Sequence, residues 1–188
     1  MVGEVDEQGL VKVWGLTRFL TDEKGHYVGH KMQHPFFGLE QRVIRAAHEQ
    51  GSDEMNFVET LYARAKFVGT SLFEHGYRGP FGIDAFIYDA SLWTPDKPIA
   101  LQAMVEINSR WTMGHVAHQL QKKLPAKNSF SWRQLMKPAL LSQGFASFSD
   151  FAKAMALRYG KGFVPTNDPD LAKQCLSYLI SDVDTEQD

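Results

Sequence analysis

Two neighbouring apolar segments decide the predicted fold: residues 76–89 read GYRGPFGIDAFIYD, and residues 98–110 read PIALQAMVEINSR. Each segment contains a run rich in β-branched and aromatic residues, bounded by glycine or proline, which is typical of a β-strand. The residues between the two runs, ASLWTPDK, contain a proline and two charged residues and suit a longer turn. The sequence therefore predicts an antiparallel hairpin with a long connecting loop.

Polar residues occupy alternate positions where the second predicted strand ends, at Glu106, Asn108 and Arg110. Side chains at alternate positions share one face of a strand, and Asp84 falls on that face if the aliphatic residues of both strands pack together. A register that places Asp84 directly opposite Glu106 would bring their Cβ atoms to ~5 Å.

Two carboxylates at that distance repel each other, which raises one pKa unless a cation lies between them. Mg²⁺ and Mn²⁺ prefer such oxygen ligands, and Asn108 adds a neutral oxygen on the same face. Arg110 extends the face with a guanidinium fork suited to phosphate or carboxylate. The alternative interpretation is a pair of solvated acids on a half-exposed sheet.

The remaining sequence alternates between strand-like and helix-like patterns. Residues 10–20 predict a strand broken at Gly15, and residues 26–32 predict the strand that returns beside it. Residues 160–169 predict a short extended segment. Apolar periodicity predicts helices over the following ranges, the second capped by Ser52 or Asp53: 38–50, 52–76, about 112–123, 132–142, 148–158 and 169–181.

This order of elements predicts an α+β fold in which an antiparallel sheet is flanked by helices. No convincing linker or internal repeat divides the 188 residues, so we expect a single lobe over residues 1–188. We expect its core over about residues 10–125. A helical extension over about 126–181 and an acidic tail over 182–188 are expected to follow.

Composition excludes several classes of partner. The formal net charge of -2 argues against nucleic acid, whose binding proteins are normally basic. Cys175 is the only cysteine, so no internal disulfide is expected, and we expect a reducing, cytoplasmic location. The polar, acidic N-terminus does not resemble a signal peptide. No apolar stretch approaches ~20 residues, so we expect no membrane-spanning segment and no membrane partner.

The hairpin and the residues after it, GYRGPFGIDAFIYD…LQAMVEINSRWTMGHVA, resemble the late metal-binding segment of ATP-grasp enzymes. That family carries an acidic residue on the first strand of a hairpin. An acid-x-Asn motif ends the second strand, commonly with an arginine two residues further on. The match falls on Asp84, Glu106, Asn108 and Arg110. The stretch VWGLTRFLTDEKGHYVGHKM is similar to the strand pair that opens the second lobe of such enzymes, so the resemblance covers residues 77–118 and, less closely, 10–76.

The resemblance implies the C-terminal subdomain of the ATP-grasp fold. It also implies an ATP-dependent carboxylate–amine or carboxylate–thiol ligase that forms an acyl phosphate. By that analogy Asp84, Glu106 and Asn108 hold Mg²⁺ or Mn²⁺ ions that bridge the phosphates of ATP. Arg110 would be the catalytic arginine that binds a phosphate or the substrate carboxylate. Arg18, in GLTRF, is a second candidate for that contact.

The sequence departs from the family in one important respect. ATP-grasp sites clamp the nucleotide between two lobes, and only the second lobe has a counterpart here. We therefore expect activity to need a nucleotide-binding lobe supplied by a second copy, as a homodimer, or by a partner chain. One alternative is a non-catalytic ATP-grasp-like subunit or remnant that serves as an interaction module. Another is an unrelated α+β binding domain in which the acid-x-Asn pattern is accidental.

Histidines recur every four residues at His26, His30 and His34, which on a helix would favour a zinc site. The neighbouring glycines and a proline argue against a helix there. On a strand, consecutive histidines of this set would lie about 13 Å apart. The pattern therefore favours separate roles for the three side chains. His115 follows the acid-x-Asn motif and is expected on the next helix as a surface or partly packed residue that could approach the hairpin.

Overall fold

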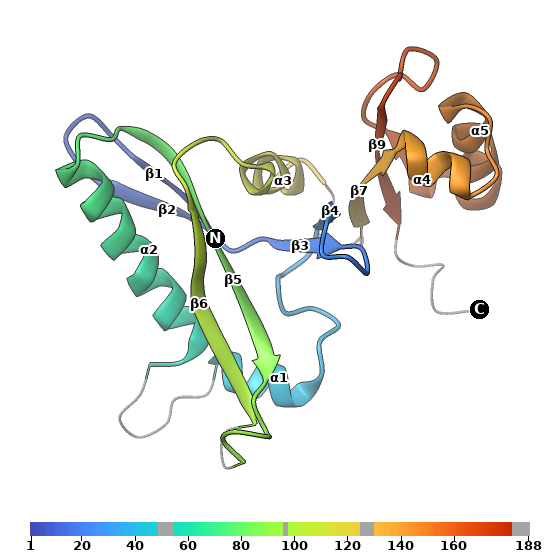
Figure 1. Ribbon diagram of the computed structural model, residues 1–188. Helices are drawn as coiled ribbons and strands as arrows, with labels where there is room; N and C mark the ends of the chain where they lie inside the picture. The colour runs from blue at the N-terminus through green and yellow to red at the C-terminus, as the bar shows by residue number, and fades with distance from the viewer. Residues whose placement is uncertain (49–54, 96–97, 125–129, 182–188) are drawn as a thin grey trace. The chain divides into compact units, whose positions relative to one another are not determined.

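The computed structural model of the protein describes residues 1–48, 55–95, 98–124 and 130–181 (Figure 1). The chain divides into two compact units, and each is described by itself. Unit 1 contains residues 1–17 and 35–118, and unit 2 contains residues 18–34 and 119–188. The expected acidic tail over 182–188 lies outside the described residues, as do Ser52 and Asp53.

Unit 1 contains a four-stranded sheet, in the order β2-β1-β5-β6, in which every pair of neighbours is antiparallel. The predicted hairpin is confirmed, because β5 and β6 are consecutive strands that pair directly. The short strand β1 pairs with β5 on its other side. The strands have these bounds: β1 Val2–Val5, β2 Val11–Gly15, β5 Gly79–Asp89 and β6 Ile99–Asn108.

The long helix α2 (Phe57–Glu74) packs on this sheet (Figure 1). Its apolar stripe, with Ala65 and Val68 at the centre, buries against Phe81 and Ile83 of β5. The N-cap is Asn56, so the expected cap at Ser52 or Asp53 was wrong. A capping box explains the start: the Asn56 side chain accepts from the Glu59 N–H at 2.9 Å, and the Glu59 carboxylate accepts from the Asn56 N–H.

Two shorter helices adjoin unit 1. Helix α1 (Gln41–His48) falls within the range expected for the first helix. Helix α3 (Met113–Gln121) begins where the sequence predicts and crosses the boundary between the two units. None of the helices that the structure describes is long and apolar enough to cross a membrane.

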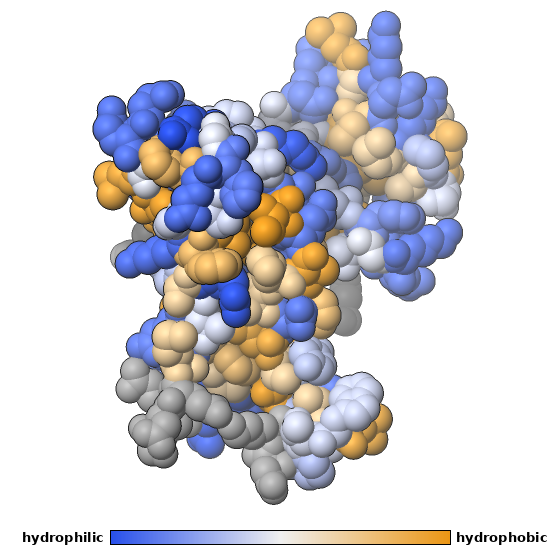
Figure 2. Space-filling view, turned by 60° about the vertical axis from the view of Figure 1, so that its left-hand side comes forward, coloured by the Kyte–Doolittle hydropathy of each residue, from blue (hydrophilic) through white to orange (hydrophobic). Residues whose placement is uncertain are grey.

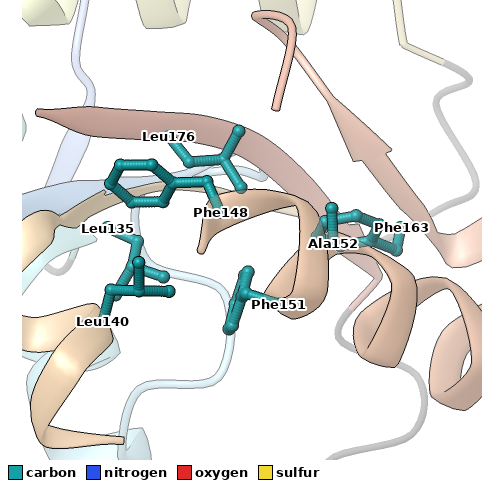
Figure 3. Close-up of a cluster of buried hydrophobic side chains, with 7 residues drawn as sticks. All are labelled: Leu135, Leu140, Phe148, Phe151, Ala152, Phe163 and Leu176. Carbon is teal, nitrogen blue, oxygen red and sulfur yellow. The ribbon is translucent and has the colours of Figure 1, made fainter. Parts of the chain in front are cut away.

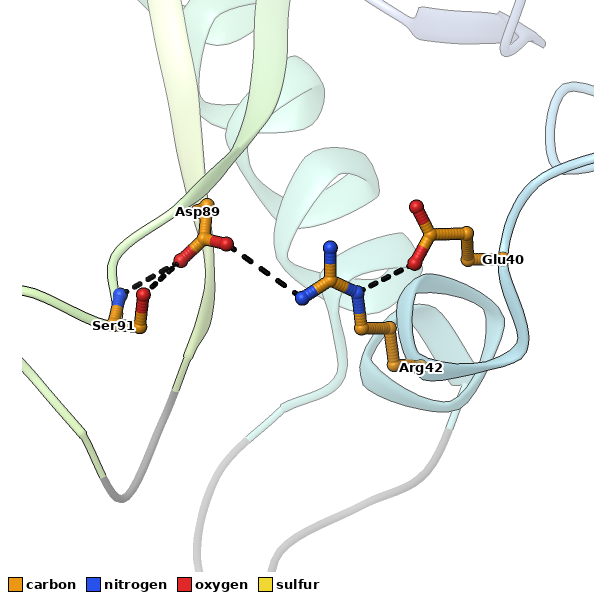
Figure 4. Close-up of polar contacts among 4 residues, drawn as sticks. All are labelled: Glu40, Arg42, Asp89 and Ser91. Atoms are coloured by element: carbon orange, nitrogen blue, oxygen red, sulfur yellow. Dashed lines mark hydrogen bonds and ion pairs between the residues drawn. The ribbon is translucent and has the colours of Figure 1, made fainter.

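Polar contacts join α1 to the end of β5 (Figure 4). The Arg42 Nε donates to Glu40 at 2.7 Å, and its guanidinium lies 3.6 Å from Asp89. Asp89 also accepts hydrogen bonds from the backbone N–H and the hydroxyl of Ser91, which lower its pKa. All of these groups are exposed to water, so we expect the contacts to orient the loop more than to stabilise the fold.

Unit 2 contains a five-stranded antiparallel sheet in the order β3-β4-β7-β9-β8. The predicted break at Gly15 is confirmed, since β2 ends there and β3 joins the other sheet. Together with unit 1, this establishes the α+β class, with two antiparallel sheets. The strands have these bounds: β3 Arg18–Thr21, β4 Tyr27–Lys31, β7 Phe130–Met136, β8 Phe163–Pro165 and β9 Cys175–Ser181.

The expected helical extension is wrong in two places, where strands replace helices. Residues 130–136 form β7, and the helix α4 begins only at Lys137 and ends at Ser142. Pro138 explains that boundary, because proline is tolerated in the first turn of a helix but not inside one. The predicted last helix over 169–181 is replaced by β9, whose seven residues pair with all seven of β7. Cross-strand pairing has overridden an apolar spacing that also fits a helix.

The predicted helix over 148–158 is confirmed as α5 (Phe148–Tyr159), and a short 3₁₀ turn (Gly160–Gly162) leads into β8. Helices α4 and α5 cover one face of the sheet and enclose the core of unit 2 (Figure 3). Phe148 and Phe151 of α5 point toward Leu176 of β9 and Leu140 of α4 in that cluster. A sheet face covered by two amphipathic helices is a common way to bury apolar surface.

Helix α4 offers a matched pair of leucines for testing this core. Leu140 is 1% exposed, whereas its neighbour Leu141 is 54% exposed. Leu140→Ala should lower the free energy of unfolding by about 2–5 kcal/mol, because it leaves a cavity among packed side chains. Leu141→Ala should cost less than about 1 kcal/mol. Chemical denaturation measures both, and equal losses would contradict this placement of the core.

Candidate functional site

The register of the β5–β6 hairpin brings the two predicted carboxylates together. Asp84 is the direct partner of Glu106, Ile83 pairs with Ile107, and Gly82 pairs with Asn108. Directly opposite residues of an antiparallel pair project to the same face, with Cβ atoms about 5 Å apart. The pairing on which the metal interpretation depends is therefore present, and Asn108 follows Glu106 on the same face.

The hairpin contains a β-bulge directly beside this pair. Asp84 pairs with Glu106 but Phe86 pairs with Gln102, so three residues of β6 stand opposite the single residue Ala85. As a result, Met104 packs against the core cluster of unit 1, whereas Val105 is 58% exposed. Strict alternation would place Met104 on the same face as Glu106, but bulges redirect side chains and bend the strand.

Asp84 is half-buried, and this burial is the main reason its pKa is raised. The charge of the Met1 amino group acts in the opposite direction, Glu106 raises the pKa further, and Arg110 lowers it. Burial therefore acts on Asp84 more strongly than the repulsion from Glu106 that the sequence predicts. A carboxylate whose charge is disfavoured in this way gains from a bound cation.

The amino group of Met1 is buried beside this pair. It donates a hydrogen bond to the carbonyl of Ile83 at 2.9 Å, and the Met1 carbonyl accepts from the Ile83 N–H at 2.9 Å. Burial lowers the pKa of the amino group to about 6.

His115 fixes the segment that follows the acid-x-Asn motif. Its Nδ1 accepts from the Thr112 N–H at 3.1 Å, so the neutral ring carries its proton on Nε2, which donates to the Gly3 carbonyl at 3.1 Å. Burial lowers the pKa of His115 and favours this neutral form. The ring is fully buried, which the sequence did not indicate, and it ties α3 to β1.

Aromatic rings hold the residue next to Arg110. The ring of Trp111 lies edge-on to those of Trp14 and His115, with centroids 5.6 and 5.0 Å away. The Arg110 N–H closes a turn onto the Asn108 carbonyl at 2.9 Å, and its guanidinium is exposed. The backbone of Arg110 is thus fixed, and its exposed guanidinium donates one long hydrogen bond, to the Trp111 carbonyl at 3.4 Å.

The other predicted positions are not part of this group. Arg18 lies in β3 of unit 2 and is therefore not part of the β5–β6 hairpin of unit 1. In the part of the chain that the structure describes, no group of three or more His, Cys, Asp or Glu side chains is arranged to hold a metal ion. His26, His30 and His34 therefore do not form a zinc site. The hairpin offers two carboxylates and one amide, and further ligands would have to be water or phosphate oxygens.

No protein-family model and no curated protein matches this sequence. The resemblance to ATP-grasp enzymes therefore remains a prediction from the residues quoted above. What the structure supplies is the register of the hairpin and the electrostatic environment of Asp84.

The influence of Glu106 on Asp84 can be tested directly. Glu106→Gln removes a negative charge across the hairpin and should lower the pKa of Asp84, measured by carbon-13 NMR of the side-chain carboxyl. The pKa of Asp84 is higher in the folded state than in the unfolded state, so the protonated form favours folding. Its contribution to stability is fully present below the unfolded-state pKa and is lost as the pH rises through the folded-state pKa. Glu106→Gln should therefore also raise the free energy of unfolding at pH 7.

Glu74→Gln is the matched control, because Glu74 is an exposed acid at the end of α2. It should leave the pKa of Asp84 unchanged. An unchanged Asp84 titration in Glu106→Gln would show that the two carboxylates do not interact.

Proposed function

We propose that unit 1 binds a Mg²⁺–ATP complex through Asp84, Glu106 and Asn108. In this proposal the protein is the metal-binding lobe of an ATP-dependent carboxylate–amine or carboxylate–thiol ligase of the ATP-grasp type. The observation that carries the proposal is the direct pairing of Asp84 with Glu106 at the end of the hairpin. The acid-x-Asn-x-Arg spacing that begins at Glu106 supports the same interpretation. We also propose a cytoplasmic location, because the single cysteine suits a reducing compartment.

Each residue has a defined task in the proposed reaction. The two carboxylates and the Asn108 oxygen would hold Mg²⁺ (or Mn²⁺), which would supply positive charge to offset that of the phosphates during phosphoryl transfer. Arg110 extends its guanidinium fork to a phosphate or to the substrate carboxylate. The substrate carboxylate attacks the terminal phosphoryl group of ATP, which forms an acyl phosphate and releases ADP. An amine or thiol then attacks the acyl carbon and releases phosphate.

A second candidate function is a non-catalytic interaction module with the same fold. The observation in its favour is the number of large apolar side chains exposed in unit 1. Figure 2 shows apolar residues (orange) at the surface among polar ones (blue). In an interaction module, a second copy of the chain or a partner chain would cover them. The exposed side chains in unit 1 include Phe37, Phe67, Phe86, Leu92, Trp93 and Trp111.

Calorimetric titration tests the proposed ligand. The full chain should bind ATP in the presence of Mg²⁺ and bind it at least about tenfold more weakly when EDTA removes the metal. Glu106→Gln should weaken the Mg²⁺-dependent binding by a similar factor, because one of two carboxylate ligands is lost. Glu74→Gln should bind as the parent protein does.

Three results would count against the assignment. The first is ATP binding that does not depend on the metal. The second is Mg²⁺-dependent binding that Glu106→Gln leaves intact, which would move the metal to another site. The third is no nucleotide binding by a folded chain that self-associates, which would favour the interaction module.

A further inference from the structure

The loop between β8 and β9 borders two hollows in unit 2. The first has a volume of about 590 Å³ and lies between this loop, the start of α4 and the start of α5. The second has a volume of about 370 Å³ and extends along α5 toward β8. Ser149, Pro169 and Asp170 line both, so the two adjoin each other. We call them the α4 hollow and the β8 hollow, and both volumes lie within the range of ligand sites in proteins.

Hydrogen bonds hold the loop in place at both ends. The Asn167 side chain accepts from the Ser177 N–H at 2.7 Å and donates to the Cys175 carbonyl at 3.1 Å. The Lys137 N–H donates to the Gln174 carbonyl at 2.8 Å, which connects the end of the loop to the start of α4. A ligand would therefore meet preformed walls, and its binding would cost little free energy for ordering the loop.

Each hollow has an apolar floor that belongs to the core of unit 2. Leu140 and Phe148 line the α4 hollow, and Ala152 and Phe163 line the β8 hollow. Figure 3 shows these four side chains within one core cluster. Apolar side chains of a ligand would therefore contact ordered apolar surface in both hollows.

The rim of the two hollows is positively charged. Lys137 and Lys173 line the α4 hollow, Lys153 lines the β8 hollow, and all three are exposed. In the part of the chain that the structure describes, none of these lysines forms an ion pair. The one carboxylate among the described lining residues is Asp170, which accepts a hydrogen bond from the Ser149 hydroxyl. The lining thus favours an anionic ligand that also carries apolar groups.

The length of the two hollows suits an extended peptide. Helix α5 borders them from Phe148 to Ala156, a rise of about 12 Å along the helix axis. About four residues of extended chain span this length. Alternate side chains of such a chain share one face, so two apolar side chains can enter the hollows. Acidic side chains between and beside them then lie near the lysines of the rim.

We propose that the two hollows bind an acidic peptide segment of a partner protein, in which two apolar residues alternate with Asp or Glu. Each apolar side chain enters one hollow, and the acidic side chains contact the lysines. The apolar floors supply most of the affinity, and the lysines select the sign of the charge. This site contains none of the hairpin residues, so it goes beyond the proposed function of unit 1 and does not depend on it.

Fluorescence anisotropy tests the proposal with the full chain and a fluorescein-labelled peptide, Glu-Asp-Leu-Asp-Phe-Asp-Glu. Binding should be saturable, with the largest NMR amide shifts at residues 148–156 and 169–174. A peptide with Ser in place of Leu and Phe keeps the charge but loses the contacts with the floors. It should bind at least about tenfold more weakly.

Charge reversal at the rim tests the role of the lysines. The double substitution Lys153→Glu with Lys173→Glu should weaken binding at least about tenfold, because it places like charges beside the acidic side chains. The matched control is Lys24→Glu with Lys66→Glu, which changes the net charge equally at exposed positions that line neither hollow. It should change binding less than about twofold. Circular dichroism checks that both variants fold.

The proposal is overturned if the acidic peptide does not bind saturably, or if the control variant weakens binding as much as the rim variant does. Equal binding of the serine peptide would also overturn it, because charge alone would then explain the affinity. Binding to phosphatidylglycerol vesicles without binding to the peptide would assign this surface to an anionic membrane instead. No arm of this test involves a nucleotide or a metal, so its failure leaves Mg²⁺-dependent ATP binding by unit 1 untouched.

Discussion

The direct pairing of Asp84 with Glu106 is the constraint on which the candidate site depends. Strand β5 is held on both sides, by β1 along residues 79–82 and by β6 along most of its length, so its register cannot slip without exposing the core. Phe81 and Ile83 bury one face of β5 against α2. The polar Asp84 is thereby directed to the opposite face, at the point where β6 presents its only acid.

The segment after β6 is fixed by packing rather than by the hairpin itself. The neutral ring of His115 connects the Thr112 backbone to the Gly3 carbonyl, and Trp111 packs against both His115 and Trp14. The backbone of Arg110 is therefore positioned by residues that touch no ligand. Burial favours the neutral ring of His115, so this connection depends little on pH near neutrality. In the hairpin beside it, by contrast, the pKa of Asp84 depends on neighbouring charged groups.

The sequence predicted local structure well where alternation or periodicity had one interpretation. The β5–β6 hairpin, α2, α3 and α5 were expected within a few residues. The shared face of Asp84 and Glu106 followed from placing the aliphatic residues together, whereas their direct opposition was an assumed register that the structure supplies. The sequence misled where an apolar spacing fits both a helix and a strand, as in β7 and β9, because only the pairing of these two strands decides between them. The bulge that turns Met104 toward the core, and the burial of His115, depend on residues distant in sequence, so no local sequence pattern indicates them.

The central claim is that a divalent cation binds between the two opposed carboxylates. Manganese titration followed by NMR tests it most directly, because paramagnetic broadening of amide signals falls steeply with distance from the ion. The account predicts that substoichiometric Mn²⁺ broadens the amides of Gly82, Asp84, Glu106 and Asn108 first, and that Glu106→Gln removes this pattern. Broadening that begins elsewhere, or that survives the substitution unchanged, would contradict the account.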